Sequence, residues 1–142
     1  MPAKRSSFRI IPHTAEVALE LRGSDWPSFF ASAARGLMAL YAVEPALPPS
    51  ETKRLEMRAD SAEELLVAWL NELIYWTGTK RWIAVEARVS EAYPTQLSAE
   101  LSGAPLPPGA RLAREIKAAT FGGLTIGGSD AKGWKATVIL DV

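Results

Sequence analysis

The sequence predicts one α+β domain over residues 1–142, with two helices packed on a mixed or antiparallel sheet of about eight strands in a two-layer arrangement. Three observations predict it. Two stretches carry apolar residues at helical spacing, many short stretches carry them at strand spacing, and strands and helices do not alternate as they do in doubly wound folds. A chain of 142 residues also has the size of one domain.

The chain begins with two predicted strands joined by a polar turn. Residues 8–11 and 17–21 are runs of β-prone residues, and they flank a turn that contains His13 and Glu16. Because an imidazole and a carboxylate share this turn, the loop is the first candidate site.

Two helices follow from their caps and apolar faces. Asp25 is a suitable N-cap for a helix that ends near Tyr41, and Ser61 with Glu64 forms a capping-box pattern for a second helix that Gly78 stops. The predicted buried face of the first helix is Trp26, Phe30, Ala33, Leu37 and Leu40, and that of the second is Leu66, Trp69, Leu70, Leu73 and Trp76.

The remaining strands are predicted from alternation of apolar and polar residues. The predicted ranges are 53–58, 82–91, 97–101, 112–121, 124–126 and 134–141. The last strand carries three consecutive apolar residues, 138–140, so we expect it to be central with both faces buried. The glycine pairs at 122–123 and 127–128 predict hairpin turns.

Composition excludes several classes of protein. Hydrophobic residues make up 48% and charged residues 23%, which excludes a disordered chain, and the absence of cysteine excludes disulfides and thiolate metal sites. Sixteen basic residues balance sixteen acidic ones, so we expect no nucleic-acid binding through bulk charge, and the small basic spots at Arg54, Arg58, Lys80 and Arg81 have acids nearby. No apolar run is long enough for a membrane span or an export signal, so we expect a cytoplasmic protein.

Few residues are suited to carry chemistry. His13 and Glu16 either face one cavity or are, respectively, a backbone-bonded turn residue and a solvated acid. Asp141 follows an apolar strand and is either solvated or an acid held at the sheet end, where Glu16 and a carbonyl of Val142 would be suitable calcium ligands. Lys117, in a predicted strand, has the character of an edge-strand lysine.

Four segments together resemble the archease family in order, spacing and position. They are FRIIPHTAEVALEL (8–21), AEELLVAWLNELIYW (62–76), EIKAATFGGLTI (115–126) and GWKATVILDV (133–142). The resemblance implies an archease-like domain and a non-enzymatic accessory protein. Its partner would be the GTP-dependent RNA ligase that joins 3′-phosphate or 2′,3′-cyclic-phosphate ends to 5′-hydroxyl ends in tRNA splicing and RNA repair. The accessory protein would promote guanylylation and repeated turnover of the ligase. It would contact RNA only indirectly, through the ligase, and would have no membrane partner.

The resemblance also implies roles for individual residues. Glu16, Asp141 and Val142 match the positions that hold a divalent metal, calcium, in the family. Lys117 matches the lysine that activates the ligase, and His13 is the second residue assigned to that role. The family usually has aspartate where this chain has Glu16 and often histidine where it has Gly122.

Two other functions remain open at this level. One is a free-standing metal-dependent phosphoesterase that uses His13, Glu16 and Asp141 with Lys117 as an electrostatic helper. It predicts phosphoester turnover by the protein alone. The other is a chaperone-like modulator of another RNA-processing enzyme, which predicts several clients bound through an apolar patch.

Overall fold

The computed structural model describes residues 5–13 and 15–142, except for the side chains of Pro12 and His13. Thr14, in the predicted turn, lies outside the described residues. Within this range the α+β class is confirmed, with helices α1 (Trp26–Tyr41) and α2 (Ala62–Gly78). The strands are β1 (Ser6–His13), β2 (Glu16–Gly23), β3 (Glu51–Arg58), β4 (Trp82–Tyr93), β5 (Gln96–Pro105), β6 (Ala118–Thr120), β7 (Gly127–Ser129) and β8 (Gly133–Asp141).

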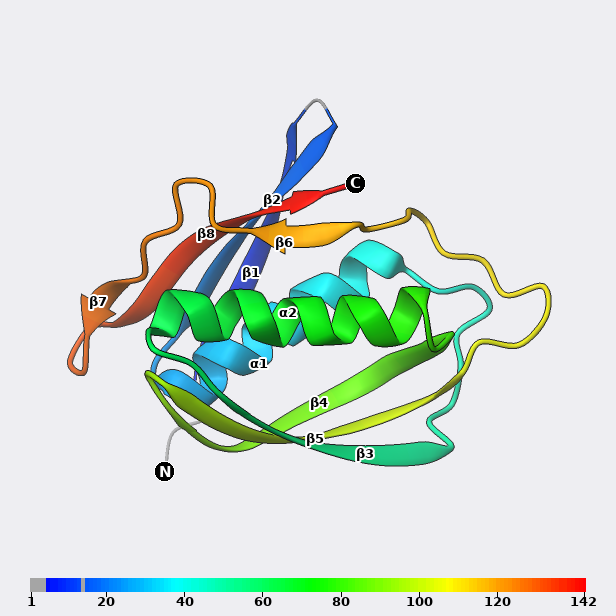
Figure 1. Ribbon diagram of the computed structural model, residues 1–142, viewed down its shortest axis with the longest axis horizontal. Coiled ribbons are helices and arrows are strands. Elements are labelled where there is room, and N and C mark those ends of the chain that lie inside the picture. Colours follow the sequence, from blue (N-terminus) through cyan, green and yellow to red (C-terminus); the bar gives the residue numbers. More distant parts are fainter. Residues whose placement is uncertain (1–4, 14) are drawn as a thin grey trace.

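The strands form two antiparallel sheets rather than one. The larger sheet has the order β1-β2-β8-β6, with β7 also paired to β8, and the smaller has the order β3-β5-β4. Both helices lie between the sheets (Figure 1), and α1 contacts β2 of one and β4 of the other. The helices therefore share a core with both sheets.

Helix α1 begins and ends where the sequence predicts. Asp25 Oδ1 accepts from the Ser28 N–H at 2.9 Å, and Ser28 Oγ accepts from the Asp25 N–H at 3.1 Å, which makes a reciprocal capping box. The helix ends at Tyr41, and its C-cap residue Ala42 has a left-handed φ of 43°.

Helix α2 also starts at its predicted cap, with one difference. Ser61 Oγ accepts from the Glu64 N–H at 3.1 Å, but the Glu64 carboxylate accepts from the N–H of Asp60, not from that of Ser61. The buried surface is broader than the predicted face and includes Leu65, Leu66, Val67, Trp69, Leu70, Leu73, Ile74 and Thr77. A helix between two sheets is covered on more than one side.

Two predicted strands differ from the structure near the end of the chain. Of residues 112–121 only Ala118–Thr120 form a strand, because their partner β8 ends at Asp141, opposite Ala118. Residues 124–126 are outside any strand, and β7 lies at Gly127–Ser129 instead. The glycine pair 122–123 lies in a turn as predicted, whereas the pair 127–128 belongs to β7.

Strand β8 is central, between β2 and β6, as predicted. Its two faces are not both buried, however. Val138 and Leu140 point into the core, whereas Thr137 and Asp141 are exposed and Ile139 is half-buried. The reason is that the helices cover only the inner face of the larger sheet (Figure 1).

Among the described residues, neither α1 nor α2 has the long apolar stretch that a membrane-spanning helix requires.

Tyr41, the last residue of α1, gives the fold a predicted pH dependence. Burial raises its pKa to about 12, the hydrogen bond with Thr77 lowers it, and the Glu115 charge raises it. The unfolded tyrosine ionises near pH 10, so the contribution of Tyr41 to stability is complete below pH 10 and is lost as the pH rises toward 12. Urea unfolding across this range should show a loss of up to about 1.4 kcal/mol per pH unit. The Tyr41→Phe variant should show a flatter profile, and equal profiles would contradict the assignment.

Candidate functional site

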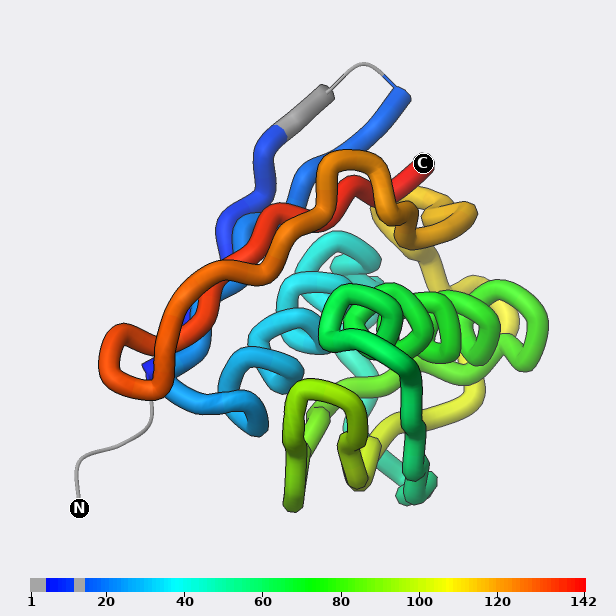
Figure 2. Tube along the Cα trace, turned by 60° about the vertical axis from the view of Figure 1, so that its left-hand side comes forward, coloured from blue at the N-terminus to red at the C-terminus, as the bar shows by residue number. Residues whose placement is uncertain are grey.

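The candidate site lies at the end of a hairpin that projects from the body of the protein. Strands β1 and β2 extend beyond the helices, and the end of β8 reaches the same region (Figures 1 and 2). Glu16 opens β2 and is the antiparallel partner of Asp141 near the end of β8. The backbone of His13 is the partner of Glu16 on the other side. We call this end of the sheet the tip.

Glu16 and Asp141 place two carboxylates on one side of the sheet, and we call them the acidic pair. Directly opposed residues of antiparallel strands point to the same face, with Cβ atoms about 4.5–5.5 Å apart. This is the outer face, because the neighbouring residues Val17 and Leu140 point into the core. Opposed like charges destabilise a sheet. A cation or a positively charged group of a partner would relieve this repulsion.

The donor atoms of the tip suit a hard cation. Asp141 is exposed and Glu16 half-buried, so their oxygens are accessible. Val142 is half-buried against the core, and its N–H approaches the carbonyl of Ala15 at 3.5 Å. Two carboxylates and a carbonyl are the ligand types of calcium, which takes six to eight oxygens and accepts water for the remainder. Among the described residues, no three His, Cys, Asp or Glu side chains are grouped so that they could hold a metal ion together. The metal role of Glu16, Asp141 and Val142 therefore stays a prediction.

Lys117 lies beside the acidic pair through its backbone. Its N–H donates to the carbonyl of Asp141 at 2.8 Å, directly before β6 begins, and its side chain is exposed. Gly122 lies in the turn after β6. The His13 side chain lies outside the described residues, so the reading that joins its imidazole to the acids stays a prediction.

Asn71 of α2 is a positioning residue that sequence reasoning missed. Its Nδ2 donates to the carbonyl of Ala119 at 3.2 Å, and its Oδ1 accepts from the N–H of the same residue at 2.8 Å. The amide thus pairs with β6 as a neighbouring strand would, and it holds the strand that directly follows Lys117. The available signal was an uncharged polar residue that, together with Glu72, interrupts an apolar helix stretch.

Replacing Asn71 tests this anchoring. Asn71→Ala leaves a backbone N–H and a carbonyl of half-buried β6 without partners, so the free energy of unfolding should fall by about 1–3 kcal/mol. Urea denaturation measures it. Asn71→Gln keeps the amide chemistry on a longer side chain and should lose less than alanine does. Unchanged stability of the alanine variant would contradict the anchoring role.

A family profile and two curated relatives match nearly the whole chain. The profile of the Archease protein family (MTH1598/TM1083) matches residues 8–142. Protein archease of Archaeoglobus fulgidus is 30% identical over 138 residues, which is 95% of this chain and 98% of the relative. Protein archease of Methanosarcina barkeri is 26% identical over the full length of both chains.

Solved structures share the fold. The solution structure of Methanobacterium thermoautotrophicum protein 1598 has a TM-score of 0.75 and 25% identity, covering 95% of this chain and 98% of that one. The crystal structure of a Thermotoga maritima archease, described as a possible chaperone, has a TM-score of 0.63 and 19% identity, covering 93% and 94%.

Proposed function

Because this chain belongs to the archease family, we propose that it is a non-catalytic accessory protein of the GTP-dependent RNA ligase that joins 3′-phosphate to 5′-hydroxyl RNA ends. It promotes guanylylation and multiple turnover of the ligase in tRNA splicing or RNA repair. The single observation that carries this proposal is the acidic pair, two facing carboxylates at the end of a projecting hairpin.

The shape of the tip supports contact with a concave partner. The β1–β2 hairpin stands clear of both helices in two views (Figures 1 and 2). Behind the acidic pair, Ala18 is 2% exposed, and its cross-strand neighbours Ile11 and Ile139 are half-buried. These side chains give the hairpin an ordered base. Such a projection suits insertion at the metal and nucleotide site of the ligase.

Charge supports the same contact. Nucleotidyl transfer depends on metal ions and on groups that neutralise phosphate charge. In the proposal, the acidic pair interacts with the metal ion or the attacking histidine of the ligase site and changes its position or charge. Lys117 contacts a phosphate group or an acidic side chain at the same site. Calcium, when bound, would be held by the side chains of Glu16 and Asp141 with the carbonyl of Val142, and would supply positive charge and order at the tip.

The experiment measures guanylylation of the purified cognate ligase. The ligase is mixed with radiolabelled guanosine triphosphate and manganese, and covalent labelling is followed over time with and without this protein. The proposal expects faster labelling when the protein is present. Labelling at the same rate in both reactions would contradict it.

A further inference from the structure

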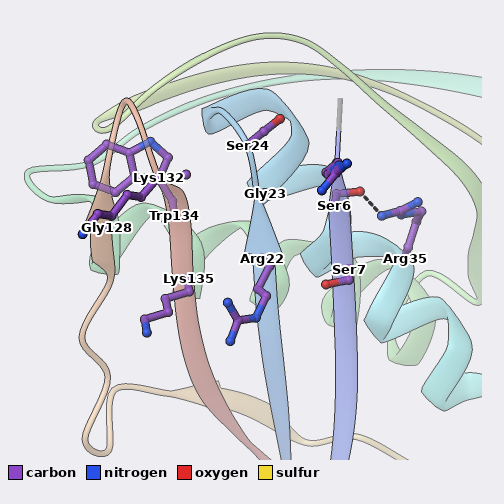
Figure 3. A pocket seen from close by; sticks show the side chains of 12 residues that line it. Ser6, Ser7, Arg22, Gly23, Ser24, Arg35, Gly128, Lys132, Trp134 and Lys135 are labelled. Atoms are coloured by element: carbon purple, nitrogen blue, oxygen red, sulfur yellow. Dashed lines mark hydrogen bonds between the residues drawn. The ribbon is translucent and has the colours of Figure 1, made fainter. Parts of the chain in front are cut away.

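A second surface lies at the other end of the larger sheet. Glu16 pairs with Asp141 at the tip, whereas Arg22 and Gly23 pair with Lys135 and Trp134, six to seven residues along β2 or roughly 20 Å away. Here the surface is hollowed into a pocket of about 870 Å³ (Figure 3). Five basic side chains line it: Arg5, Arg22, Arg35, Lys132 and Lys135. We call it the basic pocket. None of its described lining residues is acidic.

Two of these cations face each other without a compensating acid. Arg22 and Lys135 are direct antiparallel partners, so their side chains lie on one face of the sheet. Because opposed like charges destabilise a sheet, the stability of the fold does not explain why two cations are paired at this position. In the next row toward the tip, Arg9 forms an ion pair with Glu20. Among the described residues, no carboxylate forms an ion pair with Arg22 or Lys135.

The walls of the basic pocket are held in place. Arg35 of α1 donates to Ser6 Oγ at the start of β1, which orients its guanidinium toward the pocket (Figure 3). Trp134 is half-buried and stacks on Trp26 with ring centroids 4.3 Å apart and planes 22° apart. Gly133 has a φ of 80°, and a Cβ at this position would lie 2.7 Å from the carbonyl oxygen of Gly23. Only glycine therefore permits the β7–β8 hairpin to approach the end of β2 this closely.

We propose that the basic pocket binds the phosphate backbone of a single-stranded nucleic acid. Five cations from β2, α1, β8, the β7–β8 turn and the segment before β1 exceed the charge of one phosphate group and suit several phosphates in a row. Trp134, held at the pocket wall by its stacking on Trp26, offers an aromatic ring on which an unpaired base can stack. The bases of a duplex are already stacked on one another and cannot bind in this way. The pocket thus differs from the expectation that RNA is met only through a partner. The inference does not depend on the function proposed for the tip.

Binding by the isolated protein tests the proposal. Fluorescence anisotropy is measured with a labelled RNA of about 12 nucleotides, with the same sequence as a duplex, and with GTP as competitor, at several salt concentrations. The test variant is Arg22→Gln with Lys135→Gln. The control variant, Arg58→Gln with Arg88→Gln, removes two exposed strand cations from the smaller sheet and so has the same net charge.

The proposal expects the wild type to bind single strands more tightly than duplex. The test variant should bind about tenfold more weakly. Its slope of log affinity against log salt should be shallower by about 1.4, and the control variant should bind like the wild type. Absence of binding, equal loss in both variants, equal affinity for duplex, or displacement by GTP at matched phosphate concentration would each overturn it.

Discussion

The double variant Glu16→Gln, Asp141→Asn should lose most of the ligase stimulation and should fold at least as well as the wild type. The neutral amides keep the size of the side chains, so the hairpin is preserved. Removing two opposed charges relieves repulsion and should raise the free energy of unfolding by about 0.2–1 kcal/mol. Stimulation of guanylylation should fall roughly tenfold or more, since charge complementarity with the ligase is lost.

A matched control separates this effect from total charge. Glu56→Gln with Glu86→Gln removes two exposed strand acids from the smaller sheet, and full stimulation is expected. Urea denaturation and the guanylylation rate are measured for each protein. A tip variant that stimulates as well as this control would contradict the role of the acidic pair.

Trp69→Ala should be the most destabilising single change that we predict. Trp69 of α2 is fully buried between the sheets, and its Nε1–H donates to the Phe30 carbonyl of α1 at 3.0 Å. Alanine leaves a cavity and removes this hydrogen bond between the helices, so the loss should be about 3–5 kcal/mol. Small domains have about 5–15 kcal/mol in total, so the variant should be close to unfolding at 25 °C.

The midpoint and slope of urea unfolding measure this loss. Trp69→Phe keeps much of the apolar volume and removes the hydrogen bond, and it should be markedly more stable than the alanine variant. If Trp69→Ala unfolds at the wild-type midpoint, the tryptophan does not join the two helices as the structure indicates.

Local chemistry explains why the helices were predictable. The starts of α1 and α2 depend on Asp25 and Ser61, whose side chains accept hydrogen bonds from backbone N–H groups three residues later. Such interactions involve neighbours in sequence, and their spacing can be read directly. Strands β4 and β5 follow from alternation in the same way.

The division into two sheets and the short β6 depend on long-range packing. Alternation of apolar and polar residues indicates that a segment forms a strand, but not which strand it pairs with. One sheet and two sheets therefore give the same alternation in the sequence. The length of β6 is set by where β8 ends and by the amide of Asn71, both distant in sequence. For the same reason, the width of the buried surface on α2 could not be predicted from its own residues.

The two candidate sites differ in what the sequence revealed. Glu16 and Asp141 were singled out from their places in the sequence and again from the resemblance, but only strand register shows that they face each other. The cations of the basic pocket are scattered along the chain and gave no local run, and sequence analysis singled out other basic residues instead. Folding brings Arg22 opposite Lys135, and net charge zero hides this local excess.

The most direct test of the accessory function is a multiple-turnover RNA ligation assay. The cognate ligase is supplied with guanosine triphosphate, manganese and excess RNA with 3′-phosphate and 5′-hydroxyl ends, with this protein at substoichiometric amounts. We predict that the ligase alone slows after a first round of joining and that added protein sustains repeated rounds. Unchanged turnover, or phosphoester hydrolysis by this protein without the ligase, would contradict the account.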